Sequence, residues 1–146
     1  MYKSKYFTMH EMTDSITAKL NKIDNTPNDE QTEHLKELMV VLDDIRTKWG
    51  GPIRISSGYR CPELNKKVGG SSTSAHMLGY AADFKPYTND MDAFEKFINK
   101  WVKETDYLFD QVIFERDAMG NRWIHLGLYN SINKQRRQVK SLVKKG

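Results

Sequence analysis

Two histidines and one aspartate occupy positions where a polar side chain needs a partner. His76 follows a loop of small residues, Asp83 lies in an apolar stretch, and His125 lies in the apolar run 123–126. Because burying an unpaired carboxylate is costly, Asp83 requires a cation, a set of donors or a metal ion. Two imidazoles and a carboxylate, with an open fourth position, form the ligand set of a catalytic zinc site. Taken singly, each residue also fits a hydrogen-bonded core position.

Other candidate ligands are few. The chain has a single cysteine, Cys61, so it forms neither an internal disulfide framework nor a cysteine-rich zinc site. His10 and His34 lie in polar segments with helical spacing, and we expect both at the surface. A metal would therefore be bound through histidine and carboxylate side chains.

A hydrolytic zinc site also needs a proton acceptor, and Glu115 is the best candidate. It ends a β-rich run that begins at residue 110, and a second run, 122–129, follows a turn-forming segment. If these runs form a hairpin in which Ile113 pairs with His125, the two-residue period of a strand determines which side chains share a face. Those residues are Gln111, Glu115, Trp123 and His125.

An alternative for Glu115 stays open at this point. A shift of one residue in the hairpin register would turn its side chain to the other face of the sheet. A glutamate at a strand end also pairs readily with a neighbouring arginine, here Arg116 or Arg122.

Helical and extended patterns alternate along the chain. An apolar stripe up to Trp49 predicts a long helix that opens at 26–29 with Thr26 as its N-cap, and the Gly-Gly-Pro segment 50–52 ends it. Other helical segments are expected at 9–20, 62–68 and 91–102. Strands are expected at 53–56, 81–84, 110–115, 122–129 and 136–143. No linker or repeat divides the chain, so we expect residues 1–146 to form one α+β domain.

Composition restricts the class of protein. With 38% hydrophobic and 29% charged residues, the 146-residue chain has enough apolar material for a core. No apolar run is long enough to span a membrane, and the first residues lack a signal-peptide core. We therefore expect that the protein is made in the cytoplasm and does not insert into a membrane.

Positive charge is concentrated near the end of the chain, whereas the rest is nearly neutral. The basic residues of 134–146 are Lys134, Arg136, Arg137, Lys140, Lys144 and Lys145. A nucleic-acid-binding protein would spread such charge along a face or groove, so we expect no nucleic-acid partner. The basic segment is either a solvated terminal strand or a contact to an anionic polymer such as a bacterial wall.

The order of the motifs is more specific than any one of them. The chain contains Ser56-Ser57-Gly58-Tyr59-Arg60, Ser74-Ala75-His76, Gly79-Tyr80-Ala81-Ala82-Asp83 and Trp123-Ile124-His125. This succession resembles the family of zinc D-Ala-D-Ala carboxypeptidases and murein endopeptidases, which share the hedgehog/DD-peptidase fold. Segments near the start, such as Tyr6-Phe7-Thr8, are similar to the small phage-type branch. The resemblance spans roughly residues 6–143.

The resemblance implies a small antiparallel sheet that carries one zinc ion, with helices packed on one side. The positions that match the family's zinc ligands are His76, Asp83 and His125. Arg60 matches an arginine that contacts the substrate's carboxylate or carbonyl side, and its planar fork suits that contact. Ser74 matches a residue that orients the peptide or the metal site.

Two further roles follow from the same resemblance. Many family members place the base three residues before the last histidine or offer a second histidine there, but this chain has Arg122 and Trp123 at those positions. Neither accepts a proton, so the base role passes to Glu115 on the preceding strand. Gln111, on the same predicted face, is expected to contact the substrate with Arg60 and Ser74.

The implied function is a zinc metallopeptidase that hydrolyses peptide bonds in the stem peptides of bacterial peptidoglycan, as a carboxypeptidase or an endopeptidase. We expect the protein to be a monomer. Like a phage or prophage lysin, it would act on the wall after release or delivery by another component. One alternative is a non-catalytic wall-binding or virion structural module that keeps the peptidase fold. Another is a hydrolase of peptides unrelated to the wall.

Overall fold

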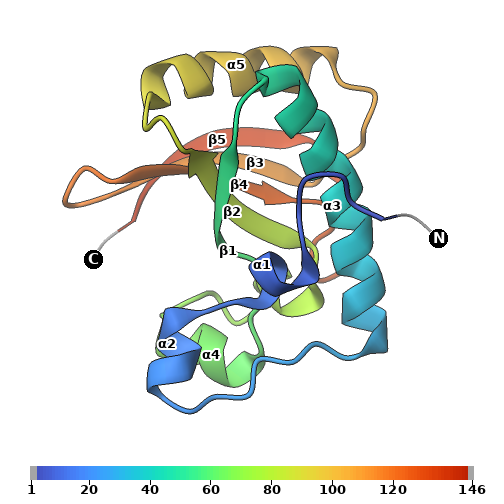
Figure 1. The fold of residues 1–146 in the computed structure, drawn as a ribbon, viewed down its shortest axis with the longest axis vertical. Coiled ribbons are helices and arrows are strands. Elements are labelled where there is room, and N and C mark those ends of the chain that lie inside the picture. Colours follow the sequence, from blue (N-terminus) through green and yellow to red (C-terminus); the bar gives the residue numbers. More distant parts are fainter. Residues whose placement is uncertain (1–2, 145–146) are drawn as a thin grey trace.

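A five-stranded sheet in the order β1-β2-β4-β3-β5 forms the centre of the computed structural model (Figure 1). Its strands are β1 (Ile53–Ser57), β2 (Ala81–Pro86), β3 (Gln111–Asp117), β4 (Arg122–Gly127) and β5 (Gln138–Lys144). The structure describes residues 3–144, so Lys145 of the basic segment lies outside the described residues. All neighbouring strands are antiparallel except β3 and β5, and the predicted α+β class is confirmed.

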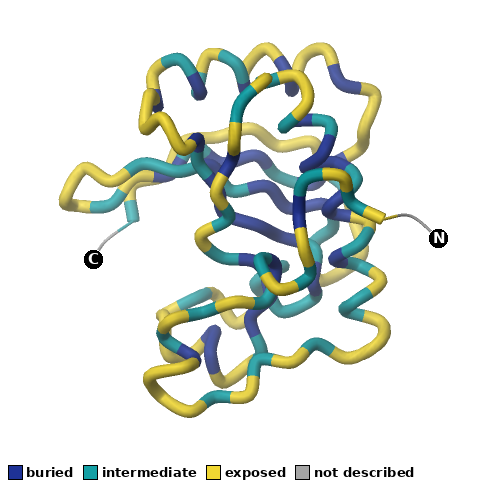
Figure 2. The backbone as a smooth tube through the Cα atoms, in the orientation of Figure 1, coloured by how far each residue is buried: buried dark blue, intermediate teal, exposed yellow. Residues whose placement is uncertain are grey.

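Helices accompany the sheet. They are α1 (Met9–Thr13), α2 (Ile16–Leu20), α3 (Asp29–Trp49), α4 (Pro62–Lys67) and α5 (Met91–Glu104), with a short 3-10 turn η1 (Ala75–Leu78). The two longest, α3 and α5, pack against the same face of the sheet, as the sequence predicted. Figure 1 shows α3 and α5 flanking the sheet, whereas α2 and α4 gather beyond its lower end. Figure 2 shows that buried residues are concentrated in the central strands. Within residues 3–144, no helix is both long enough and apolar enough to cross a membrane.

Helix α3 begins later than the sequence predicted. Its N-cap is Asn28, whose side chain accepts a hydrogen bond from the Gln31 backbone while the Gln31 side chain accepts one from the Asn28 backbone. Thr26, the expected cap, instead donates its hydroxyl to Asp24. The helix ends as predicted at Gly50, which adopts a φ of 80°.

The predicted helix over 9–20 is two short helices. The chain is extended at Asp14 and Ser15, and the Ser15 hydroxyl caps α2 by accepting from the Ala18 backbone. This break allows α1 to press against the sheet. Met12 is fully buried, and its carbonyl oxygen accepts a hydrogen bond from the Tyr59 backbone just after β1.

The last strand, β5, lies where the sequence predicted it but runs parallel to β3. The basic segment that leads into it is anchored rather than simply solvated. Arg136 binds the Asp110 carboxylate through two guanidinium nitrogens, and Arg137 donates to the carbonyl oxygens of Val102 and Thr105. The residues of β5 itself are exposed, apart from the half-buried Lys144.

The hairpin of β3 and β4 has the register that places Glu115 and His125 on one face, because Ile113 pairs with His125. On the other edge of β4, Asp83 of β2 lies opposite His125. Phe84, the next residue, is fully buried in the core that lies against α3 and α5. We call the other face, which carries Asp83, His125 and Glu115, the open face of the sheet.

Candidate functional site

The three predicted metal ligands lie together on the open face. One ligand atom from each of His76, Asp83 and His125 lies within 4.8 Å of the other two. The Asp83 atom Oδ1 lies 3.4 Å from His76 Nε2 and 2.9 Å from His125 Nδ1. Strands β2 and β4 supply Asp83 and His125, and the turn η1 brings His76 over them. These residues could hold a metal ion.

Local contacts fix the orientation of His76. The Ser74 hydroxyl caps the turn η1 by accepting a hydrogen bond from the His76 backbone. His76 Nδ1 lies 2.7 Å from the Gly58 carbonyl oxygen, so Nδ1 carries the proton and Nε2 is left facing Asp83. Gly58 must be a glycine, because a Cβ there would lie 2.2 Å from the Met12 carbonyl oxygen.

The ionisation of the cluster follows from burial and from contacts within it. Burial lowers the pKa of His76, which keeps its imidazole neutral, the form that binds a metal. Burial by itself would raise the pKa of Asp83. The contacts with His76 and His125 outweigh that effect and hold the pKa of this carboxyl well below its usual value. The cluster therefore offers two imidazoles and one carboxylate.

This donor set fits zinc. Protein zinc sites hold imidazole nitrogen and carboxylate oxygen at about 2.0–2.2 Å in a tetrahedron, so neighbouring ligand atoms lie roughly 3.4 Å apart. The separation between His76 Nε2 and Asp83 Oδ1 is 3.4 Å. His125 Nδ1 lies 2.9 Å from the same oxygen, and all three ligand atoms lie within 4.8 Å of one another, so shifts of up to about 1.4 Å would bring them to the tetrahedral spacing.

Glu115 lies on the open face near this cluster. Its side chain is buried, and Trp123, directly opposite across the hairpin, donates a hydrogen bond from Nε1 to its carboxylate. Burial raises the pKa of Glu115, and the negative charge of Asp83 raises it further. A buried carboxylate with a raised pKa in a pocket has the properties of a general acid or base.

The alternative partners of Glu115 lie on the other face of the sheet. Arg116 and Arg122 pair with each other in register, one position beyond Glu115, and therefore face α5. There Arg122 binds the carboxylates of Asp92 and Glu95. The alternative in which Glu115 pairs with Arg116 or Arg122 is therefore wrong.

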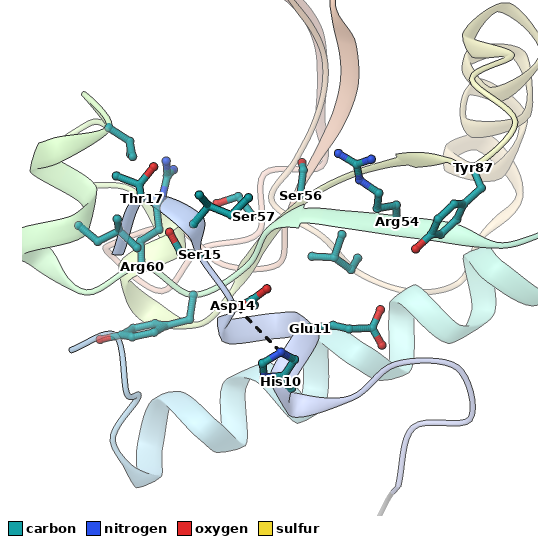
Figure 3. A pocket seen from close by; sticks show the side chains of 15 residues that line it. His10, Glu11, Asp14, Ser15, Thr17, Arg54, Ser56, Ser57, Arg60 and Tyr87 are labelled. Atoms are coloured by element: carbon teal, nitrogen blue, oxygen red, sulfur yellow. Dashed lines mark ion pairs between the residues drawn. The ribbon is translucent and has the colours of Figure 1, made fainter. Parts of the chain in front are cut away.

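Arg60 lies beside the cluster and is almost wholly buried. Burial lowers its pKa, whereas the charges of Asp83 and Glu115 act in the opposite direction and favour the protonated guanidinium. Its Nε has no hydrogen-bond partner among the described residues. Because buried donors are seldom left unpaired, this nitrogen is available to a bound molecule. Arg60 also lines a second pocket of about 550 Å³ along β1 (Figure 3).

The cluster opens into a pocket of about 470 Å³. Gln111, an expected substrate-binding residue, lies in its wall with its side-chain amide bonded to the Gln138 side chain. Residues of the loop 69–74 also line the pocket, and contacts with Asn65 hold this loop in place. Asn65 donates a hydrogen bond to the Ser71 carbonyl oxygen, and a Cβ at Gly70 would lie 2.1 Å from Asn65 Oδ1.

One wall of this pocket was not predicted. Residues of the segment 130–136 and of β5 line it, and Asp110 anchors that segment by accepting three hydrogen bonds from Arg136. Burial alone would raise the pKa of Asp110, but the contacts with Arg136 lower it. The sequence showed an acid at the start of a β-rich run, but it did not show the distant partner of that acid.

The two discounted histidines differ from one another. His10 is largely exposed, as expected. His34 is not a surface residue: it is half-buried, its ring stacks on Tyr80 at 3.9 Å, and its Nδ1 lies 2.7 Å from the Leu78 carbonyl oxygen. Leu78 ends η1, so His34 supports the turn that carries His76.

An antiparallel hairpin with a buried His-Asp-His cluster, a carboxylate and an arginine in one pocket is the arrangement of a metal-dependent hydrolase. A protein-family model described as Peptidase M15 matches residues 5–127, a range that includes the whole cluster. The chain belongs to the Peptidase M15 family and is a peptidase, which confirms the resemblance found in the sequence. No curated protein matches the chain. The segment 128–144, with the unpredicted wall, lies outside the matched range.

Proposed function

We propose that the protein is a zinc-dependent peptidase that hydrolyses peptide bonds in the stem peptides of bacterial peptidoglycan. The observation that carries this proposal is one pocket that unites a cluster able to hold a metal, a buried carboxylate and an unpartnered guanidinium. These residues are His76, Asp83, His125, Glu115 and Arg60. When bound, zinc supplies a Lewis acid that activates water and polarises the scissile carbonyl.

Glu115 is the general base in this proposal. The pKa of Glu115 is raised toward neutral pH, and a base whose pKa lies near the working pH is both deprotonated and strong enough to accept a proton. The Trp123 indole holds one carboxylate oxygen by a hydrogen bond. The proton that a carboxylate oxygen of Glu115 accepts from water is then donated to the nitrogen of the leaving amine.

The other site residues bind and orient the peptide. Arg60 donates from its guanidinium to a carboxylate or carbonyl oxygen of the substrate, which gives its unsatisfied Nε–H a partner. Gln111 and Ser74 both line the pocket, where their amide and hydroxyl groups can bond an extended peptide backbone.

Mass spectrometry of peptidoglycan and soluble muropeptides tests the proposal. The zinc-loaded protein is compared with a chelated sample, with His76→Ala, and with Lys96→Ala as a control for an exposed residue away from both pockets. We expect cleavage by the wild type and by Lys96→Ala only. Loss of a terminal D-Ala would identify a carboxypeptidase, and separated stems or crosslinks would identify an endopeptidase.

Two results would replace this proposal. A protein that holds one zinc ion and sediments with the wall but cuts nothing would be a wall-binding module. Cleavage of ordinary L-peptides in preference to muropeptides would indicate a hydrolase of other substrates.

The proposal also includes action as a monomer and, as in a phage or prophage lysin, delivery to the wall by another component. Light scattering in solution and clearing of wall suspensions test these last two points.

A further inference from the structure

Cations lie on the open face at the β5 edge of the sheet. Residues that pair across strands share a face of the sheet. Lys140 pairs with Ile113, and Ile113 pairs with His125, so Lys140 lies on the same face as His125. Lys144 pairs with Asp117, two residues beyond Glu115, and therefore also lies on the open face. Lys144 lines the pocket of the metal cluster, and its Nζ lies 6.0 Å from the centre of the Trp123 ring.

The opposite edge of the sheet carries cations on the same face. Ser57 of β1 pairs with Asp83, whereas Arg54 pairs with Lys85, two residues beyond Asp83. An irregularity in the register between Ile55 and Ser57 keeps Arg54 on the open face although it lies three residues before Ser57. The metal cluster thus lies between cations at β1 and β2 and cations at β5.

None of these cations is neutralised by an ion pair with a carboxylate in the part of the chain that the structure describes. The four are Arg54, Lys85, Lys140 and Lys144. Arg54 and Arg60 both line the pocket along β1 (Figure 3). Arg60 also lines the pocket of the cluster, so the two pockets adjoin at this residue.

We propose that the substrate peptide crosses the open face from β1 to β5, and that cations on both sides of the metal cluster recognise its carboxylates. Arg54 binds a carboxylate on one side of the bond that is cut, and Lys140 and Lys144 bind carboxylates on the other side. The substrate class is therefore a peptide with acidic groups flanking an internal bond. This proposal rests on the proposed peptidase function and adds residues of β5, which lies beyond the family match.

Binding experiments test this proposal separately from catalysis. The zinc-loaded Glu115→Gln protein is titrated with a synthetic stem peptide that carries free carboxylates, and with versions amidated on one side or on both sides of the central bond. In this protein Arg54→Gln and the double variant Lys140→Gln/Lys144→Gln remove the two groups of cations. Lys96→Gln, an exposed lysine of α5 in the opposite layer, is the matched control.

We expect each cation variant to weaken binding of the free-carboxylate peptide by about two- to fivefold, the range of exposed ion pairs, and to lose this effect at high salt. The fully amidated peptide should bind all variants equally. For a peptide amidated on one side of the central bond, removing one group of cations should leave the affinity unchanged. Removing the other group should still weaken binding.

Three results would overturn the proposal. These are equal affinities for free and fully amidated peptides, an effect of Lys96→Gln as large as that of the other variants, and no measurable binding of either peptide. Failure of the wild-type protein to cut any peptide would instead refute the proposed function. The affinities measured with Glu115→Gln would still decide whether the cations recognise carboxylates.

Discussion

The hydrogen bond from Trp123 to Glu115 provides a direct test of how the base is held. Trp123→Phe removes the indole N–H but keeps an aromatic ring beneath Lys144. A hydrogen bond to a charged acceptor contributes about 1.5–3 kcal/mol. If that energy positions the carboxylate in the transition state, its loss lowers kcat/KM by about 10- to 100-fold, at 1.36 kcal/mol per tenfold change. The half-buried ring stays apolar, so we expect the melting temperature to change little.

The pH profile distinguishes positioning of Glu115 from a structural effect of the substitution. Burial raises the pKa of Glu115, whereas the Trp123 hydrogen bond lowers it. Because the base must be deprotonated, activity falls as pH decreases through this pKa, and Trp123→Phe should move that acid limb to higher pH. Stopped assays on a muropeptide between pH 4 and pH 9, roughly the range around the carboxyl and imidazole pKa values, measure both effects. A rate within twofold of the wild type, with an unmoved acid limb, would refute this reasoning.

Four further predictions concern the base, the metal and the backbone around them. Glu115→Gln should bind zinc as the wild type does by elemental analysis, yet lose about 10²- to 10⁴-fold in turnover. Because burial raises the pKa of Glu115, this carboxyl destabilises the metal-free fold increasingly as pH rises through that pKa, so metal-free Glu115→Gln should melt higher than the wild type at pH 7. Zinc at 100 times its Kd should stabilise the wild type by about 2.7 kcal/mol in thermal melts, and should leave His125→Ala unchanged. Gly58→Ala should cost about 1–3 kcal/mol in denaturant unfolding, since its Cβ would meet the Met12 carbonyl, and should weaken zinc binding by shifting the acceptor of His76. An alanine variant with unchanged stability and zinc affinity would contradict the close packing at Gly58.

Much of the candidate site was predictable because its residues stand out from their neighbours in the sequence. Asp83 and His125 interrupt apolar strands, and a polar residue in such a place requires a partner. The sequence predicted the hairpin but left its register open between two alternatives, and the structure has the one in which Ile113 pairs with His125. These features depend on neighbours along the chain or across one turn, which sequence patterns describe well.

The features that the sequence did not reveal depend on distant parts of the chain. Asp110 and Arg136 lie far apart in sequence, and neither residue type alone indicates that they bind each other. The parallel course of β5 follows from how the chain returns after β4, which strand propensity does not describe. The break between α1 and α2 accompanies a contact between distant parts of the chain, in which the Met12 carbonyl accepts a hydrogen bond from the Tyr59 backbone.

The central claim is that zinc held by His76, Asp83 and His125 enables this chain to cut wall stem peptides. Zinc titration of the metal-free protein, with muropeptide cleavage followed by mass spectrometry at each step, tests it most directly. We expect no cleavage without metal and a rate that rises to a plateau at one equivalent of zinc. Cleavage in the metal-free protein, or no cleavage once one equivalent of zinc is bound, would contradict it.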